Sequence, residues 1–119
     1  MASSLVIVDD HAGFRRSARR LLESDGFVVV GEAADGASGI AQVRTRRPRV
    51  VLVDVVLPDI DGFAVAELLA DEPEPVVVVL TSSREATDLV TRLARSPAKG
   101  FVHKGDLTGA ALSAIVEAP

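Results

Sequence analysis

The sequence predicts an α/β fold in which five β-strands alternate with five helices around one parallel sheet. Five short runs of β-branched and aliphatic residues recur at nearly even spacing, and each interval between them is long enough for a helix. The central runs are apolar without alternation, as expected for strands that are covered on both faces. Because short connections join the elements, we expect right-handed crossovers and a doubly wound (βα)5 sheet.

The expected elements follow one another along the whole chain. Strands are expected at residues 5–8, 27–30, 50–53, 76–80 and, with the weakest pattern, 101–103. Apolar residues three or four positions apart predict helices at residues 14–22, 37–41, 63–70, 86–94 and 107–115. Gly26, Pro48 and Pro73 mark turns between elements. Ser82 with Glu85 has the pattern of a capping box, which predicts that the fourth helix starts directly after Ser82.

Composition excludes several classes of protein. The 119 residues suit a single domain over residues 1–119, and 48% hydrophobic residues are enough for a core. The lack of cysteine excludes disulfides, cysteine-bound metals and thiol nucleophiles. A net charge of −4 disfavours direct binding to nucleic acid. The longest apolar run, residues 76–80, is far shorter than the ~20 residues of a membrane helix, and a signal peptide is not evident. We therefore expect a cytoplasmic protein without membrane contact.

Residues that bear chemistry stand where the expected strands end. Asp9 and Asp10 follow the first strand, Asp54 the third, Thr81 the fourth and Lys104 the fifth. Ligands of open parallel sheets bind outside these strand ends. If the first and third strands are neighbours, three carboxylates meet there, and such a group is costly unless a cation balances it. Oxygen ligands suit Mg²⁺, while the lysine and the threonine could bind a phosphoryl group.

Four stretches of the chain resemble the signature segments of one protein family. They are LVIVDDH, VVLVDVVLPDIDG, VVVVLTSS and GFVHKG, and they match in order and spacing the receiver domain of two-component response regulators. The likeness covers essentially the whole chain and implies a flavodoxin-like fold with strand order 2-1-3-4-5. The site residues that it implies are Asp54 as phosphoacceptor, Asp9, Asp10, Asp54 and the Val56 backbone carbonyl as Mg²⁺ ligands, Thr81 and Lys104 as phosphoryl-binding groups, and Thr81 and Phe101 as switch residues.

The resemblance also implies a function in a phosphorelay. A sensor histidine kinase or a histidine phosphotransfer domain would donate the phosphoryl group to Asp54 in a Mg²⁺-dependent reaction. This would switch the surface of the fourth helix, fifth strand and fifth helix, so that the chain is a phosphoacceptor rather than an enzyme. The run VDDHAGFRRSARRLLES followed by FVVVGEAADGASG resembles regulators with a LuxR-type helix-turn-helix output domain. That likeness implies control of transcription through an output domain outside these residues, and it also implies that the chain can form a homodimer.

Two other functions fit parts of the sequence. The DxDG pattern at residues 59–62 is typical of aspartate-nucleophile phosphohydrolases of the haloacid dehalogenase type, although it follows Pro58 instead of a strand. A pseudo-receiver, which would be an interaction module that needs no phosphorylation, is disfavoured by the intact set of site residues.

A basic stripe runs along the first expected helix. It consists of Arg15, Arg16, Arg19 and Arg20. The default interpretation is a helix face exposed to solvent, and the alternative is a docking face for an acidic partner surface such as that of the kinase. The two histidines are expected to have no chemical role: His11 would be a surface or capping residue, and His103 a structural one.

Overall fold

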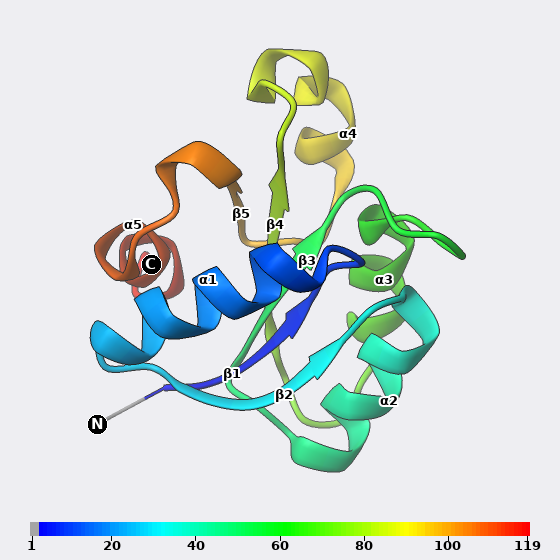
Figure 1. The fold of residues 1–119 in the computed structure, drawn as a ribbon. Coiled ribbons are helices and arrows are strands. Elements are labelled where there is room, and N and C mark those ends of the chain that lie inside the picture. Colours follow the sequence, from blue (N-terminus) through cyan, green and yellow to red (C-terminus); the bar gives the residue numbers. More distant parts are fainter. Residues whose placement is uncertain (1–2) are drawn as a thin grey trace.

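The computed structural model describes residues 3–119 and shows a five-stranded parallel sheet with helices on both faces (Figure 1). The strands are β1 (Ser4–Val8), β2 (Val28–Ala33), β3 (Val50–Asp54), β4 (Val77–Ser82) and β5 (Gly100–His103). The helices are α1 (Ala12–Ser24), α2 (Gly36–Arg46), α3 (Gly62–Leu69), α4 (Val90–Arg95) and α5 (Gly109–Val116). The strand order β2-β1-β3-β4-β5 confirms the predicted doubly wound, flavodoxin-like fold. None of these helices is long and apolar enough to cross a membrane.

The sheet separates two apolar clusters, which explains why helices cover both of its faces. One cluster packs the sheet against α2 and α3, with Ile40 and Phe63 among its buried members. The other packs the opposite face against α1 and α5, with Leu22 and Leu112 fully buried. Every residue of β3 is buried, as its uninterrupted apolar run predicts. Removal of these side chains from water is the main force that holds the layers together.

Polar side chains fix the starts of three helices. Asp35 accepts a hydrogen bond from the Ser38 N–H at α2, Asp61 from the Ala64 N–H at α3, and Thr108 from the Ala111 N–H at α5. Such caps satisfy backbone N–H groups that have no partner inside the helix. They set where each helix begins relative to the strand ends, and so they shape the loops around the site.

The fourth helix differs from the prediction. Ser82 is the last residue of β4, and its Oγ accepts a hydrogen bond from the Arg84 N–H at 3.0 Å within a turn. A short 3₁₀ helix at Ala86–Asp88 follows, and α4 begins only at Val90. The predicted capping box at Ser82 is therefore wrong. The last helix also starts later than predicted, because Thr108 is its N-cap and the buried Leu107 packs from the preceding loop.

Candidate functional site

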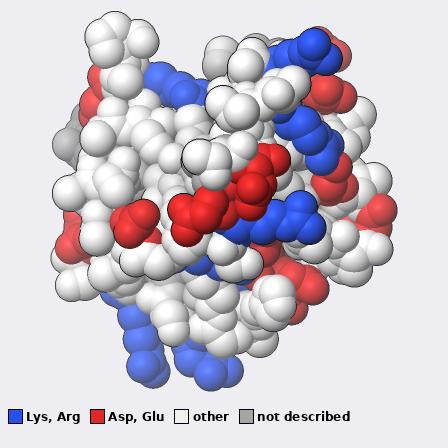
Figure 2. All heavy atoms as spheres, turned by 90° about the horizontal axis from the view of Figure 1, so that it is seen from above, with Lys and Arg blue, Asp and Glu red and all other residues white. Residues whose placement is uncertain are grey.

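The predicted site residues meet at the edge of the sheet where the strands end. Asp9 and Asp10 directly follow β1, Asp54 ends β3, and Lys104 directly follows β5. Thr81 lies on β4 opposite Asp54 in the parallel register. Because β1 and β3 are neighbours, carboxylates that are distant in sequence come together here, as predicted. Seen from above this edge, acidic side chains gather near the middle of the face (Figure 2).

A lysine bridges the two buried carboxylates of the site. Asp9 is fully buried and Asp54 is 3% exposed. The Lys104 Nζ atom lies 2.7 Å from Asp9 Oδ2 and 2.8 Å from Asp54 Oδ2. The same ammonium lies 4.4 Å from the centroid of the Phe14 ring, which is within the range of a cation–π contact. One positive charge is therefore shared by two buried acidic groups, so that these three ionised side chains carry a net charge of −1.

Burial and neighbouring charges change the pKa of each member of this trio. Burial raises the pKa of Asp54, and the charge of Asp9 raises it further. Lys104 and the Val56 N–H lower this pKa, but by less, so that it stays above its ordinary value. Burial acts in the same direction on the pKa of Asp9, but Lys104 and the His11 N–H outweigh it and lower that pKa. Burial disfavours the Lys104 ammonium, but the two carboxylates raise the pKa of Lys104 above its ordinary value. The ionised form of Asp54 is therefore the least stabilised of the three.

The backbone after β3 orients the Asp54 carboxylate. The Val56 N–H donates to Asp54 Oδ1 at 3.0 Å, which leaves Oδ2 facing the lysine. The Val56 side chain is 55% exposed and adds no polar group to the pocket. A ligand role for the Val56 carbonyl stays a prediction.

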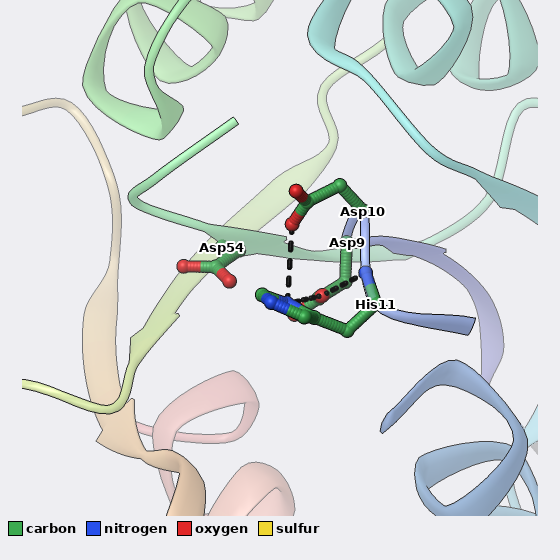
Figure 3. A group of neighbouring side chains, drawn as sticks. All are labelled: Asp9, Asp10, His11 and Asp54. Atoms are coloured by element: carbon green, nitrogen blue, oxygen red, sulfur yellow. Dashed lines mark hydrogen bonds and ion pairs between the residues drawn. The ribbon is translucent and has the colours of Figure 1, made fainter. Parts of the chain in front are cut away.

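The acidic residues of this edge are suited to a divalent cation. Asp9, Asp10, His11 and Asp54 each place one ligand atom within 4.8 Å of the others (Figure 3). Three of these groups are carboxylates, the donors that hard ions such as Mg²⁺ prefer. A divalent charge would also offset the acidic excess that Lys104 leaves uncompensated. The donor set and the charge of the pocket therefore fit Mg²⁺.

His11 is the N-cap residue of α1 and its side chain is 68% exposed, which confirms the expected surface or capping position, but the contact of its ring with the acid pair was not predicted. Its Nδ1 atom lies 3.0 Å from Asp9 Oδ1 and 3.1 Å from Asp10 Oδ1, so the ring stands against both carboxylates (Figure 3). The only sequence signal was its place directly after the acid pair. His103 is structural as expected: its Nε2 contacts the Ser83 carbonyl and its Nδ1 accepts a hydrogen bond from the Gly105 N–H.

Thr81 holds a buried hydroxyl beside the carboxylates. The residue is fully buried, and its Oγ1 atom has no hydrogen-bond partner within residues 3–119. A buried polar atom left unpaired costs about 1–3 kcal/mol, so such an atom calls for an explanation. An oxygen of a bound phosphoryl group would be a suitable partner for the hydroxyl.

Phe101 lies one strand further along the sheet, in register with Leu80 of β4. Its ring is half-buried and packs against the same apolar cluster as α2 and α3. It also borders a hollow of about 360 Å³ between β5 and α5, which His103 and Ile115 help to line. The switch role of Phe101 stays a prediction.

The DxDG pattern does not contribute to the pocket. The Asp59 carboxylate accepts hydrogen bonds from the Gly36 and Ala37 N–H groups at 2.8 and 2.9 Å, at the start of α2. Asp61 caps α3 and pairs with Arg92 at 2.6 Å. Both acidic groups serve helix ends, which speaks against the phosphohydrolase interpretation.

The basic stripe of α1 is divided between two environments. Arg15 Nε lies 3.3 Å from Glu32 Oε1, and Arg19 Nη1 lies 2.9 Å from Glu32 Oε2, so both side chains turn toward β2. Arg16 and Arg20 are exposed. The predicted four-residue face is therefore corrected to two outward arginines, since Glu32 engages the other two.

The fold and the pocket together define a flavodoxin-like domain with an acidic site at its strand ends. A family model described as the response regulator receiver domain matches residues 5–116, and the chain belongs to this family. The resemblance seen in the sequence is thereby confirmed.

Individual relatives agree with this assignment. The response regulator GacA of Pseudomonas protegens is 38% identical over 103 residues, which cover 85% of this chain and 48% of that protein. The receiver domain of NarL from Mycobacterium tuberculosis superposes with a TM-score of 0.87 at 30% identity and covers 98% of both chains. A two-component response regulator of the LuxR family from Aurantimonas sp. SI85-9A1 has a TM-score of 0.87 at 25% identity, over 98% of this chain and 86% of that one. These structures support the LuxR-type likeness.

The chain spans half the length, or less, of the curated relatives that it matches. Those relatives include transcription regulators and also protein-glutamate methylesterases. Proteins with different activities therefore share this segment.

Proposed function

We propose that the chain is a phosphorylation-dependent switch in which Asp54 accepts a phosphoryl group from a sensor histidine kinase or a histidine phosphotransfer domain. The observation that carries the proposal is the Lys104 bridge between Asp9 and Asp54, beside the Thr81 hydroxyl, for which residues 3–119 offer no hydrogen-bond partner. Membership of the receiver family supports it. A single receiver domain over residues 1–119, located in the cytoplasm, is part of the same proposal.

The residues of the chain suit direct transfer between donor and acceptor. An Asp54 carboxylate oxygen attacks the phosphorus, and the new O–P bond forms as the N–P bond of phosphohistidine breaks, leaving its electron pair on the imidazole. The Val56 N–H holds the carboxylate in one orientation during the attack. Lys104 balances the charge that arrives with the phosphoryl group, and Thr81 donates a hydrogen bond to one of its oxygens.

The metal ligands in this proposal are Asp9, Asp10, Asp54 and the backbone carbonyl of Val56. Bound Mg²⁺ supplies positive charge to the transferred group and to the acidic residues around it. The excess of three carboxylates over one lysine supports this assignment. Because Asp54 is both a proposed ligand and the acceptor, its ionised form is needed for both tasks.

Phosphorylation would change the surface of α4, β5 and α5. The modified carboxylate carries about −1.5 to −2 charges, and Thr81 turns toward its oxygens as Phe101 occupies the space released. We propose that this change controls transcription through a LuxR-type output domain and a homodimer. The similarity to GacA and to LuxR-family structures supports this choice of output.

The proposal is tested by supplying acetyl phosphate, with and without Mg²⁺, to the wild-type chain and to Asp54→Asn. We expect Mg²⁺-dependent, stoichiometric labelling of the wild type and none of the variant. Multiple turnover of a generic phosphomonoester would instead favour the phosphohydrolase. If partner binding occurred without labelling and were unaffected by Asp54→Asn, the chain would be a pseudo-receiver.

A further inference from the structure

Three hydrogen bonds hold the short turn that carries the acid pair after β1. The Asp9 N–H donates to the Ala33 carbonyl of β2 at 3.0 Å. The His11 N–H donates to Asp9 Oδ1 at 2.8 Å. Arg15 Nη1, which comes from the first turns of α1, donates to the Asp9 carbonyl oxygen at 2.6 Å. Both backbone groups of Asp9 are therefore hydrogen-bonded, the N–H to β2 and the carbonyl oxygen to the Arg15 side chain.

The Arg15 guanidinium is itself held in place. Its side chain is 19% exposed, and its Nε lies 3.3 Å from Glu32 Oε1 on β2. Arg19 pairs with the other oxygen of the same glutamate. A planar guanidinium can serve a carboxylate and a carbonyl at once with different N–H groups, which a lysine ammonium does with far less geometric control.

Asp10 is the acidic residue that most needs this support. Asp9 is fully buried and contacts Lys104, whereas the Asp10 side chain is 38% exposed. Within the described residues, the recorded polar contact of the Asp10 carboxylate is with His11 Nδ1 at 3.1 Å. Its direction is therefore set mainly by the backbone. Because the peptide group is planar, fixing the Asp9 carbonyl also fixes the plane from which Asp10 extends.

We propose that Arg15 is a positioning residue for divalent-cation binding, which acts by orienting the Asp9–Asp10 peptide so that both carboxylates face one point. This deepens the proposed function and rests on it. Residues that support metal ligands without touching the metal commonly change metal affinity by about 10–100-fold when replaced. Within the basic stripe of α1, Arg15 thus supports the site, whereas the neighbouring Arg16 is exposed to solvent.

The test compares Arg15→Gln with Arg16→Gln, whose side chain is exposed on the same helix. The chain has no tryptophan or tyrosine, so Mg²⁺ binding is followed by NMR titration. We expect Arg15→Gln to weaken Mg²⁺ affinity by about tenfold, Arg15→Lys by less, and Arg16→Gln to match the wild type. In metal-free protein, the His11 amide, which donates to Asp9 Oδ1, should exchange faster in Arg15→Gln than in the wild type. Labelling by acetyl phosphate should need more Mg²⁺ but reach the wild-type rate at saturation.

Equal Mg²⁺ affinity in Arg15→Gln and Arg16→Gln would overturn the inference while leaving the proposed function intact. A lower labelling rate at saturating Mg²⁺ with unchanged affinity would overturn it too. If Arg15→Gln does not fold, Arg15→Lys and Glu32→Gln decide, because each weakens the anchor while keeping a donor at residue 15; unchanged affinity in both refutes the role. A wild-type chain that binds no Mg²⁺ would remove the proposed function itself.

Discussion

Asp9 and Asp54 share one ammonium and are both buried, yet their pKa values shift in opposite directions. Burial raises the pKa of each, but Asp9 receives the His11 N–H in addition to Lys104. Asp54 receives the Val56 N–H but also faces the charge of Asp9. In metal-free protein, the electrostatic cost of the pocket therefore falls mainly on the ionised form of Asp54, the proposed phosphoacceptor.

This asymmetry predicts opposite effects of two equivalent substitutions. For Asp54, whose pKa is raised, stabilisation is present below the unfolded pKa of about 3.9 and is lost as pH rises through the folded pKa. For Asp9, whose pKa is lowered, stabilisation is present above about pH 3.9 and is lost as pH falls through the folded pKa. At pH 7 without Mg²⁺, Asp54→Asn should therefore increase the free energy of unfolding and Asp9→Asn should decrease it, as measured by urea denaturation.

A surface substitution provides the control for this pair. Asp71→Asn, at an exposed position after α3, should change the free energy of unfolding by no more than about 0.5 kcal/mol. The stabilisation by Asp54→Asn should shrink as the pH is lowered through the raised pKa of Asp54, because the wild-type carboxyl then takes up a proton. If both Asp54→Asn and Asp9→Asn lowered the free energy of unfolding at pH 7, the electrostatic cost of the pocket would not be concentrated on Asp54.

The residues of the pocket were predictable to different degrees. Asp9, Asp54 and Lys104 could be predicted because parallel strands bring their carboxyl ends to one edge, whatever the side-chain conformations are. The His11 ring and the bond from Arg15 to the Asp9 carbonyl could not, because they depend on rotamers and on Glu32 of another strand. Sequence periodicity places a residue on a helix face but does not show what it contacts there.

At the scale of elements, α4 is the helix with the least support from the core. None of its six residues is buried. The Arg92 guanidinium ties it to α3, with Nη2 2.6 Å from Asp61 and its carbon 4.1 Å from the centroid of the Phe63 ring. Burial acts to raise the pKa of Asp61, but Arg92 and the Ala64 N–H lower it overall. The Arg92 side chain thus links α4 to the start of α3, in addition to the packing of Leu93 against the core.

Removal of this link should loosen α4 without unfolding the domain. We expect Arg92→Ala to accelerate amide hydrogen exchange in α4 and to lower the free energy of unfolding by about 1 kcal/mol or less, since the side chains of Arg92 and Asp61 are 55% and 38% exposed and solvent screens the pair. Arg95→Ala, on the same helix, is the control and should leave the exchange near the wild-type rate. Equal exchange in the two variants would show that the Asp61 and Phe63 contacts do not restrain α4.

The start of α4 shows why one element was mispredicted. A capping box is a local pattern, and Ser82 and Glu85 satisfy it in sequence. In the structure, Ser82 instead pairs with His103, so that β4 continues through Ser82 as a strand. Pairing between strands far apart in sequence overrides the local preference at that residue. The five strands themselves were predictable because their apolar runs are short, evenly spaced and bounded by turns.

At the scale of the whole molecule, strand order decides whether a site exists. The alternation of strands and helices predicts a doubly wound sheet, but the order 2-1-3-4-5 came from the family resemblance. That order makes β1 and β3 neighbours and puts β4 and β5 on the other flank. Carboxylates from two strands therefore meet a hydroxyl and a lysine from the next two. The residues proposed for the transfer therefore meet at one edge of the sheet.

The most direct measurement identifies the residue that carries the phosphoryl group. The wild-type chain is treated with acetyl phosphate and Mg²⁺, the acyl phosphate is reduced with borohydride to homoserine, and the peptides are sequenced by mass spectrometry. We expect homoserine at position 54 alone, and none when Mg²⁺ is omitted. Homoserine at Asp9, Asp10 or Asp59, or its absence from folded protein with Mg²⁺ present, would contradict the assignment of Asp54 as the phosphoacceptor.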